Sequence, residues 1–139
     1  MNDEQAAQLK GFQVYDPIDP FENRAGPFFY RLDSHDRPVF ALAAERRHCN
    51  TYNIVHGGLM MTLIDLTMVA AAKEHRAEQL VTVSLNSEFL ASGHTGDVLF
   101  ARGELIRRTR SLAFVRGLIE VDGNVVFAAS AVLKRLRPT

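Results

Sequence analysis

One apolar run constrains this fold more strongly than any other feature of the sequence. Between residues 57 and 72, leucine, methionine and alanine side chains recur at helical spacing, and Asp65 is the only ionisable residue. These residue types favour helices. We therefore predict a helix from residue 57 to about residue 75, buried on most of its sides. The run is too short, and too polar at its centre, to span a bilayer.

Segments with strand character lie on both sides of this helix in the sequence. We predict strands at residues 28–32, 39–45, 80–90, 97–108, 111–121 and 124–136. Asp122-Gly123 is a strong hairpin signal between the last two. Small residues such as Gly103 and Gly117 lie in mid-strand, which indicates that a bulky element packs closely there. The predicted fold class is therefore α+β, with one long apolar helix packed against an antiparallel sheet.

The first part of the chain is expected to be a lead-in to this unit, over residues 1–27. Residues 3–10 are predicted to form a short surface helix. Residues 15–27 hold three prolines and Gly26, and are predicted to be irregular. A chain of 139 residues has the commonest size for one domain. We therefore expect a single domain over residues 28–137.

Charge and cysteine content exclude several classes of partner. Sixteen basic residues balance sixteen acidic ones, so no general attraction to nucleic acid or to an anionic membrane is expected. The single cysteine, Cys49, cannot form an internal disulfide, which fits a reducing compartment. The first residues lack the pattern of a signal peptide. We expect a cytoplasmic protein with no nucleic-acid or membrane partner.

Asp65 requires an explanation, because burying a lone carboxylate is costly. It could pair with an arginine at the rim of the helix, or act as a general base or nucleophile in a dry site. Gly58 and Thr62 lie on the same helical stripe as Asp65.

The start of the helix has chemistry of its own. His56, Gly57 and Gly58 lie where the first amide N–H groups of a helix are unpaired and the helix dipole is positive. Such a place can bind an oxyanion or a phosphate. The alternative is a glycine hinge that only lets the chain turn.

Taken together, the run Asn50-x5-His56-Gly57-Gly58-x6-Asp65 resembles the signature of the PaaI-type hotdog-fold acyl-CoA thioesterases. The resemblance covers about residues 28–136 and includes the segments at 81–90, 96–97, 111–115 and 122–123. It implies the hotdog fold. The sequence departs from the family pattern at Asn53, where relatives often have glycine.

The resemblance also implies an activity and its residues. It assigns catalytic roles to Asn50, His56, Gly57, Asp65 and Thr82. The Gly57 amide, with Gly58, would polarise the thioester carbonyl, and Asp65 would activate water or attack directly. Asn50 and His56 would orient the reactants, and Thr82 would lie beside the acid. In such proteins the site is shared between subunits, so we expect a homodimer or a dimer of dimers. No metal or cofactor is expected.

Three more residues are predicted to bind the phosphates of the acyl-CoA substrate, namely Arg108, Arg110 and Ser111. Arginine suits phosphate geometry. The alternative is that this arginine-rich region is a solvated sheet edge, answered by Glu104 and Glu120. Two other functions compete with hydrolysis. One is a hotdog dehydratase or hydratase that uses His56 and Asp65, and the other is an acyl-CoA-binding protein without catalysis.

Overall fold

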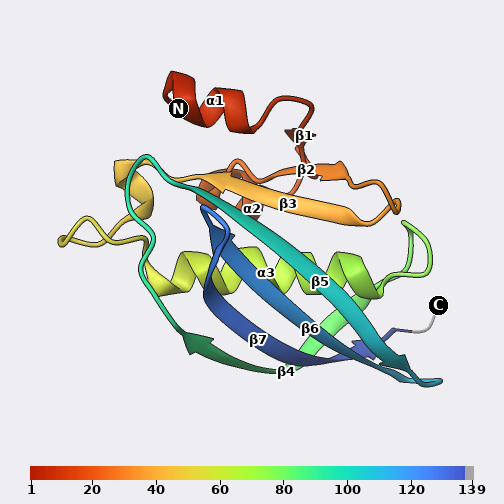
Figure 1. Cartoon of the computed structure of the whole chain (residues 1–139). Helices are drawn as coiled ribbons and strands as arrows, with labels where there is room; N and C mark the ends of the chain where they lie inside the picture. Colours follow the sequence, from red (N-terminus) through yellow and green to blue (C-terminus); the bar gives the residue numbers. More distant parts are fainter. Residues whose placement is uncertain (137–139) are drawn as a thin grey trace.

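The computed structural model describes residues 1–136, in which an antiparallel sheet curves around one long helix (Figure 1). The elements are α1 Asp3–Gln8, β1 Gln13–Val14, α2 Pro20–Ala25, β2 Phe29–Leu32, β3 Pro38–Ala43, a 3-10 turn at Arg46–His48, α3 Gly57–Ala72, β4 Leu80–Phe89, β5 Val98–Arg108, β6 Leu112–Val121 and β7 Asn124–Arg135. The strands follow the order β1-β2-β3-β5-β6-β7-β4. The predicted fold class and the predicted strands are confirmed.

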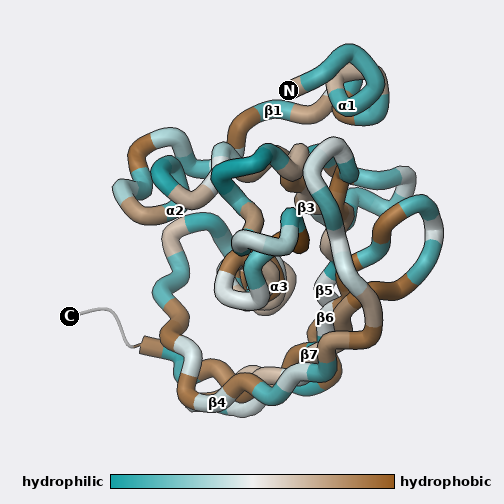
Figure 2. Tube along the Cα trace, turned by 90° about the vertical axis from the view of Figure 1, so that its left-hand side faces the viewer, coloured by the Kyte–Doolittle hydropathy of each residue, from teal (hydrophilic) through white to brown (hydrophobic). Residues whose placement is uncertain are grey.

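The helix α3 provides the core of the molecule. Leu63, Ile64 and Met68 are fully buried against the concave face of the sheet. The helix ends at Ala72, slightly earlier than predicted, because Lys73 has an extended backbone with ψ of 133°. Viewed almost along α3, the strands β5, β6, β7 and β4 enclose it on one side (Figure 2).

Two glycines explain how α3 lies so close to the sheet. A Cβ atom on Gly103 would lie 2.9 Å from the Cβ of Ala71, and one on Gly117 would lie 2.7 Å from Cδ1 of Ile64. Both positions therefore need the absence of a side chain. This confirms the prediction that a bulky element packs against the middle of these strands.

The prediction of an irregular segment at residues 15–27 is wrong for its second half, where α2 forms. The Asp19 carboxylate accepts a hydrogen bond from the Glu22 backbone N–H at 2.8 Å, and Pro20 occupies the first turn of the helix. Both are favourable at a helix start. The lead-in also joins the sheet, since β1 pairs with β2. The predicted domain of residues 28–137 ends at Arg137, which lies outside the described residues.

The helix α1 confirms the helix predicted near the N-terminus and is fixed to the sheet by Gln5. This side chain is buried, and its Nε2 donates to the carbonyl oxygens of Ala44 at 2.9 Å and Asp97 at 3.0 Å. In the described part of the chain, no helix has the length and apolar character needed to cross a membrane.

The strand β4 lies at one edge of the sheet. It pairs with β7 on one side, and within residues 1–136 it has no partner on the other. Val81, Val83 and Phe89 are exposed along it, at 43%, 61% and 57%. A long edge strand with exposed apolar side chains is prone to pair with another chain.

Candidate active site

Asp65 and Thr82 form a direct contact beside the middle of α3. Thr82, on the edge strand β4, donates its hydroxyl to Oδ1 of Asp65 at 2.6 Å. Such a short bond to a charged acceptor is a strong one. Within residues 1–136 no ion pair involves Asp65, so the alternative of a structural partnership with arginine is not what the structure shows. The structure therefore brings together the predicted acid and the predicted hydroxyl.

This pair borders a pocket that we call the Asp65 pocket, with a volume of about 590 Å³. Its apolar walls come from α3, α2 and β4, through Met61, Leu66, Val69, Phe21 and Leu85. Its polar groups include Asp65, Thr82 and Glu22. A pocket that combines apolar walls with convergent polar groups is typical of a binding site for a small organic molecule.

The start of α3 presents one free amide. The N–H of Gly58 donates to Nδ1 of its helix cap, His56, at 3.0 Å, so this amide is occupied. The Gly57 N–H has no hydrogen-bond partner among the described residues. Of the two amides predicted to face an oxyanion, only that of Gly57 is available in the single chain.

Phe89 covers this helix start, because a Cβ atom on Gly57 would lie 3.0 Å from Cε1 of the Phe89 ring. The ring belongs to the exposed edge strand β4 and is itself largely exposed.

Asn50 organises the loop that leads to α3. Its Oδ1 accepts from the backbone N–H groups of Tyr52 at 2.9 Å and Ile54 at 3.2 Å. Asn53, the departure from the family pattern, has φ of 62°. Asparagine is one of the few residues other than glycine that tolerate this left-handed backbone. The loop therefore keeps a shape that glycine would also allow.

The two halves of the predicted site lie apart within one chain. Gly57 and Asp65 are both on α3 and separated by eight residues, since the helix runs unbroken over Gly57–Ala72. At the usual rise per residue this is about 12 Å along the axis. A reacting carbonyl must lie roughly 3 Å from both its oxyanion donor and its attacking group. One chain therefore cannot place both groups on one thioester.

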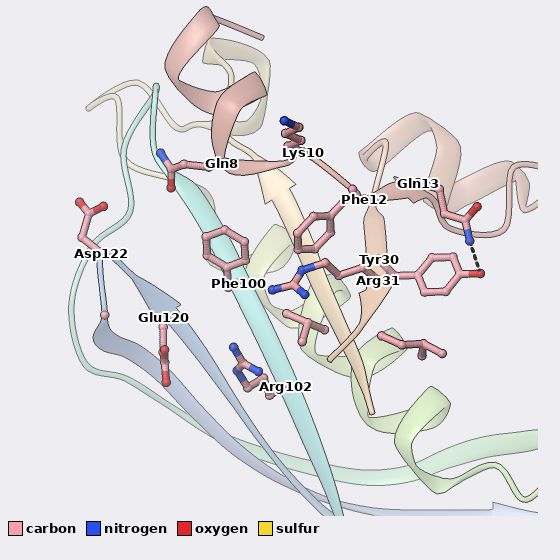
Figure 3. Close-up of a pocket in the computed structure, with 14 residues that line it drawn as sticks. Gln8, Lys10, Phe12, Gln13, Tyr30, Arg31, Phe100, Arg102, Glu120 and Asp122 are labelled. Atoms are coloured by element: carbon pink, nitrogen blue, oxygen red, sulfur yellow. Dashed lines mark hydrogen bonds between the residues drawn. The ribbon is translucent and has the colours of Figure 1, made fainter. Parts of the chain in front are cut away.

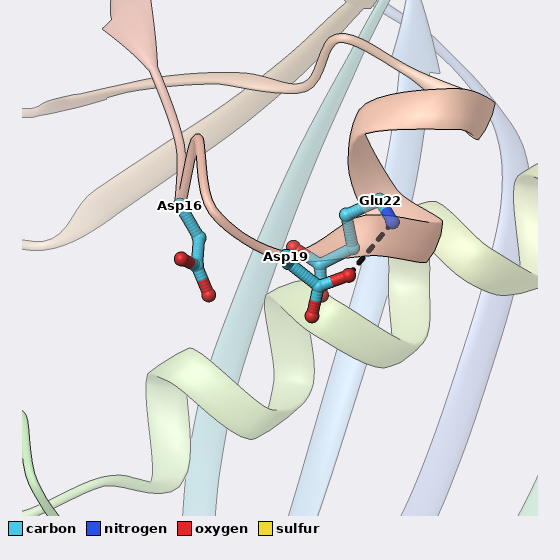
Figure 4. Close-up of side chains that lie close together, drawn as sticks. All are labelled: Asp16, Asp19 and Glu22. Carbon is cyan, nitrogen blue, oxygen red and sulfur yellow. Dashed lines mark hydrogen bonds between the residues drawn. The ribbon is translucent and has the colours of Figure 1, made fainter.

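An acidic cluster on the lead-in faces the same pocket, and the sequence analysis missed it. Carboxylate oxygens of Asp16, Asp19 and Glu22 lie within 4.8 Å of one another (Figure 4). Burial, together with the neighbouring carboxylates of Asp19, Asp16 and Asp65, raises the pKa of Glu22 to about 7. Oε1 of Glu22 is buried and has no hydrogen-bond partner among the described residues. The motif Asp19-Pro20-x-Glu22, a helix-start pattern, is the signal that could have placed Glu22 on a helix.

The raised pKa of Glu22 predicts how stability depends on pH. The folded protein holds a proton on Glu22 up to about pH 7, whereas the unfolded chain loses it near 4.5. Stability therefore falls as pH rises through this window. Glu22→Gln should remove this fall and stabilise the protein at about pH 8 by roughly 1 kcal/mol, a value reduced for solvent screening of a half-buried group. Urea unfolding of both proteins at about pH 5 and pH 8 tests this. An equal pH dependence of the free energy of unfolding in both proteins would contradict this expectation. Glu104→Gln, a change at an exposed residue of β5, is the control.

Arg108, one of the predicted phosphate ligands, lies in an ion-pair network at the other end of α3. Its guanidinium contacts Glu78 at 2.9 Å and Glu74 at 3.2 Å, and it donates to the carbonyl oxygen of Ala72. Its donors are thus engaged by protein partners, which argues against a phosphate contact. Arg110 and Ser111 lie exposed at the β5–β6 turn, and their predicted role stays a prediction.

A second pocket, of about 750 Å³, lies away from α3, between the lead-in and the outer face of the sheet (Figure 3). Phe12, Phe100, Arg31 and Arg102 line it, and the Arg31 guanidinium lies 5.2 Å from the centre of the Phe12 ring. None of the predicted catalytic residues lines it. This second pocket is therefore not the place of the chemistry expected from the sequence.

Comparison with known proteins identifies the family of this chain. The sequence pattern of the thioesterase superfamily matches residues 52–128. The Pseudomonas aeruginosa protein PA0474, whose name assigns it provisionally to the esterases, is 30% identical over 125 residues, which is 88% of this chain and 93% of that one. The chain belongs to the thioesterase superfamily.

Solved structures show the same fold. A variant of the phenylacetic acid degradation protein PaaI from Thermus thermophilus superposes with a TM-score of 0.74 at 22% identity, over 85% of this chain and all of that one (100%). The BH2602 protein of Bacillus halodurans, solved with coenzyme A, gives 0.77 at 18% identity, over 98% of this chain and 89% of that one. The hotdog fold and the resemblance to PaaI-type proteins are confirmed.

Proposed function

We propose that this protein is an acyl-CoA thioesterase, which hydrolyses a thioester to a free acid and coenzyme A. The observation that carries the proposal is Asp65, the one ionisable residue of α3, held by Thr82 at 2.6 Å on the wall of an apolar pocket. Membership of the thioesterase superfamily supports this reaction type. The coenzyme A bound in the Bacillus halodurans structure supports this substrate class.

Thioester hydrolysis needs a group that promotes attack and a group that stabilises the oxyanion. Asp65 supplies the first, either by taking a proton from the attacking water or by attacking the carbonyl carbon itself. Thr82 holds the carboxylate in position through its hydroxyl. The Gly57 N–H, at the positive end of the α3 dipole, supplies the second. Asn50 and His56 keep the loop and the helix start in place for it.

The working unit in this proposal is a homodimer formed along β4. About 12 Å separates Gly57 from Asp65 along one helix, so a complete site takes Gly57 from one chain and Asp65 from its partner. Pairing of two β4 edges would join the sheets and cover the exposed Val81 and Val83. A two-fold axis then gives two equal sites. A dimer of dimers would keep this unit.

The activity is tested with a panel of acyl-CoA thioesters and detection of the free thiol. We expect hydrolysis of at least one class of acyl group, abolished when the protein is unfolded. The panel should include short, medium and aromatic acyl groups, because the apolar pocket does not specify a length. Tight binding of acyl-CoA without any release of thiol would contradict the proposal and support a binding protein without catalysis.

The oxyanion role of Gly57 predicts the effect of a single methyl group. Gly57→Ala should lower kcat/KM by roughly tenfold or more, because the methyl crowds the carbonyl that approaches the amide. Helix stability should change little, since alanine favours helices and the methyl meets only the far end of the Phe89 ring, which is 57% exposed. The N–H of Gly58 already donates to His56, so Gly58→Ala should lower kcat/KM less than Gly57→Ala does. Kinetics and melting temperatures of both variants decide this. An active Gly57→Ala enzyme would mean that Gly57 is only a hinge.

A further inference from the structure

Glu22 reaches the Asp65 pocket from an element that the thioester chemistry does not use. It lies on α2, which also contributes Phe21 to the pocket, and the other lining residues come from α3 and its end, from β4 and from the stretch before α2. Its carboxyl is half-buried, and Oε1 is buried without a hydrogen-bond partner among the described residues. No cation of the described residues forms an ion pair with it. Glu22 therefore adds a carboxyl without an ion-pair partner to the wall of the pocket.

The other charged groups around this pocket are mostly acidic. Asp16 and Asp19 line it from the stretch before α2, and Asp65 from α3. Tyr15 lies beside them with a pKa that burial and the nearby carboxylates of Glu22 and Asp16 raise, so its phenol stays neutral. Lys73, just beyond the end of α3, is the cation that lines the pocket. Among the described residues, the lining of this pocket therefore holds several carboxylates and one positive charge.

We propose that Glu22 determines specificity by excluding acyl groups that carry a negative charge away from the thioester. This inference rests on the proposed thioesterase function and takes the Asp65 pocket as the place of the acyl chain. The apolar side chains of Met61, Leu66 and Val69 favour an uncharged chain there. A terminal carboxylate would lose its hydration in this pocket and face four carboxyl groups against one lysine, with no arginine among the described residues of this chain that line it. The substrate class is therefore acyl groups without a second carboxylate.

Glu22 also makes this selection depend on pH. Its pKa of about 7 means that it is largely neutral at about pH 6 and largely ionised at about pH 8. Asp16, Asp19 and Asp65 face it from the lead-in and from α3, and Lys73 opposes them. Ionisation of Glu22 adds one more negative charge to the pocket. Discrimination against a dicarboxylic acyl group should therefore increase as pH rises through 7.

The experiment compares matched thioesters of equal chain length, butyryl- with succinyl-CoA and hexanoyl- with adipoyl-CoA. The measured quantity is the ratio of kcat/KM for the uncharged member to that for the charged member. In the unmodified protein this ratio should be large and should rise about fivefold from pH 6 to pH 8, as expected for one added charge at several ångströms. In Glu22→Gln the ratio should be smaller, with most of the rise lost. Glu104→Gln, exposed on β5, should behave like the unmodified protein.

The outcomes separate this inference from the function on which it rests. Hydrolysis of the uncharged thioesters with equal rates for the charged ones would overturn the specificity and leave the thioesterase function intact. A ratio that is the same in Glu22→Gln as in the unmodified protein would also overturn it. Absence of hydrolysis with all four thioesters and the wider panel would overturn the function itself. Activity of the Gln variant on butyryl- or hexanoyl-CoA shows that it has folded.

Discussion

Replacement of Asp65 by asparagine is expected to lower the turnover of an acyl-CoA thioester by about 10²-fold or more, which is the usual effect of removing a catalytic acid–base group. Asparagine has the same shape and keeps an oxygen that accepts the Thr82 hydroxyl, but it can neither take a proton from water nor attack a carbonyl. The fold should survive, because Asp65 makes no ion pair within residues 1–136.

Steady-state kinetics and a melting curve of the same preparation check this expectation. Asp36→Asn is the matched control, since Asp36 is exposed in the β2–β3 turn with φ of 59°, where asparagine fits well. The control should keep full activity. Asp65→Asn with nearly full turnover would remove Asp65 from the mechanism. A large fall in melting temperature would show instead that Asp65 has a structural role.

Replacement of Glu78 by glutamine is expected to have the largest effect on stability, a loss of about 3 kcal/mol at neutral pH, because it removes the buried anion that two largely buried arginines share. Oε1 of Glu78 accepts from Arg108 at 2.9 Å and from Arg135 at 3.0 Å, and the side chain is only 7% exposed. Its Oε2 accepts from the backbone N–H of Glu74 at 2.7 Å. This network fastens the segment after α3 to β5 and β7.

The pH dependence gives a second measure of the same network. Burial acts to raise the pKa of Glu78, but the Glu74 backbone N–H and the guanidinium groups of Arg135 and Arg108 outweigh it and lower the pKa to about 2. The stabilisation is therefore complete above about pH 4.5 and is lost as pH falls toward 2. Denaturant unfolding across this range should show that loss in the unmodified protein and not in Glu78→Gln. The side chain of Glu74 is 53% exposed, so Glu74→Gln should lower the free energy of unfolding by at most about 1 kcal/mol. Equal losses in both variants would contradict this account of the network.

The sequence predicted most of the fold because its two periodicities are clear. Apolar side chains at helical spacing predicted α3, and the mid-strand glycines Gly103 and Gly117 indicated where α3 approaches the sheet. The order of the strands in the sheet, with β4 at the edge, is a property of pairing between distant segments. Periodicity within one segment cannot supply it.

The sequence was less informative about partners of charged groups. Arg108 was placed near a substrate phosphate or beside Glu104 and Glu120, but the folded chain pairs it with Glu74 and Glu78. Those acids lie in the turn after α3, and only the packing of α3 across β5 brings them to Arg108. Glu22 was missed for a similar reason. A proline-rich stretch was predicted to be irregular, although Asp19 and Pro20 are good residues for starting a helix.

The central claim is that the active site combines Gly57 and Asn50 of one chain with Asp65 of its partner. Mixing two impaired variants, Asp65→Asn and Asn50→Asp, tests it most directly. Asn50→Asp keeps the oxygen that accepts from Tyr52 and Ile54, and so preserves the loop, while it loses the amide N–H₂. The two are unfolded and refolded together, and hybrid dimers are counted by native mass spectrometry.

A hybrid dimer with shared sites has one site with both changes and one site with neither. At equal mixing, half of the dimers are hybrids, so activity should recover to about a quarter of that of the unmodified protein, far above either variant alone. If instead hybrids form and activity stays at the level of the separate variants, each chain contains its own complete site and the account is contradicted.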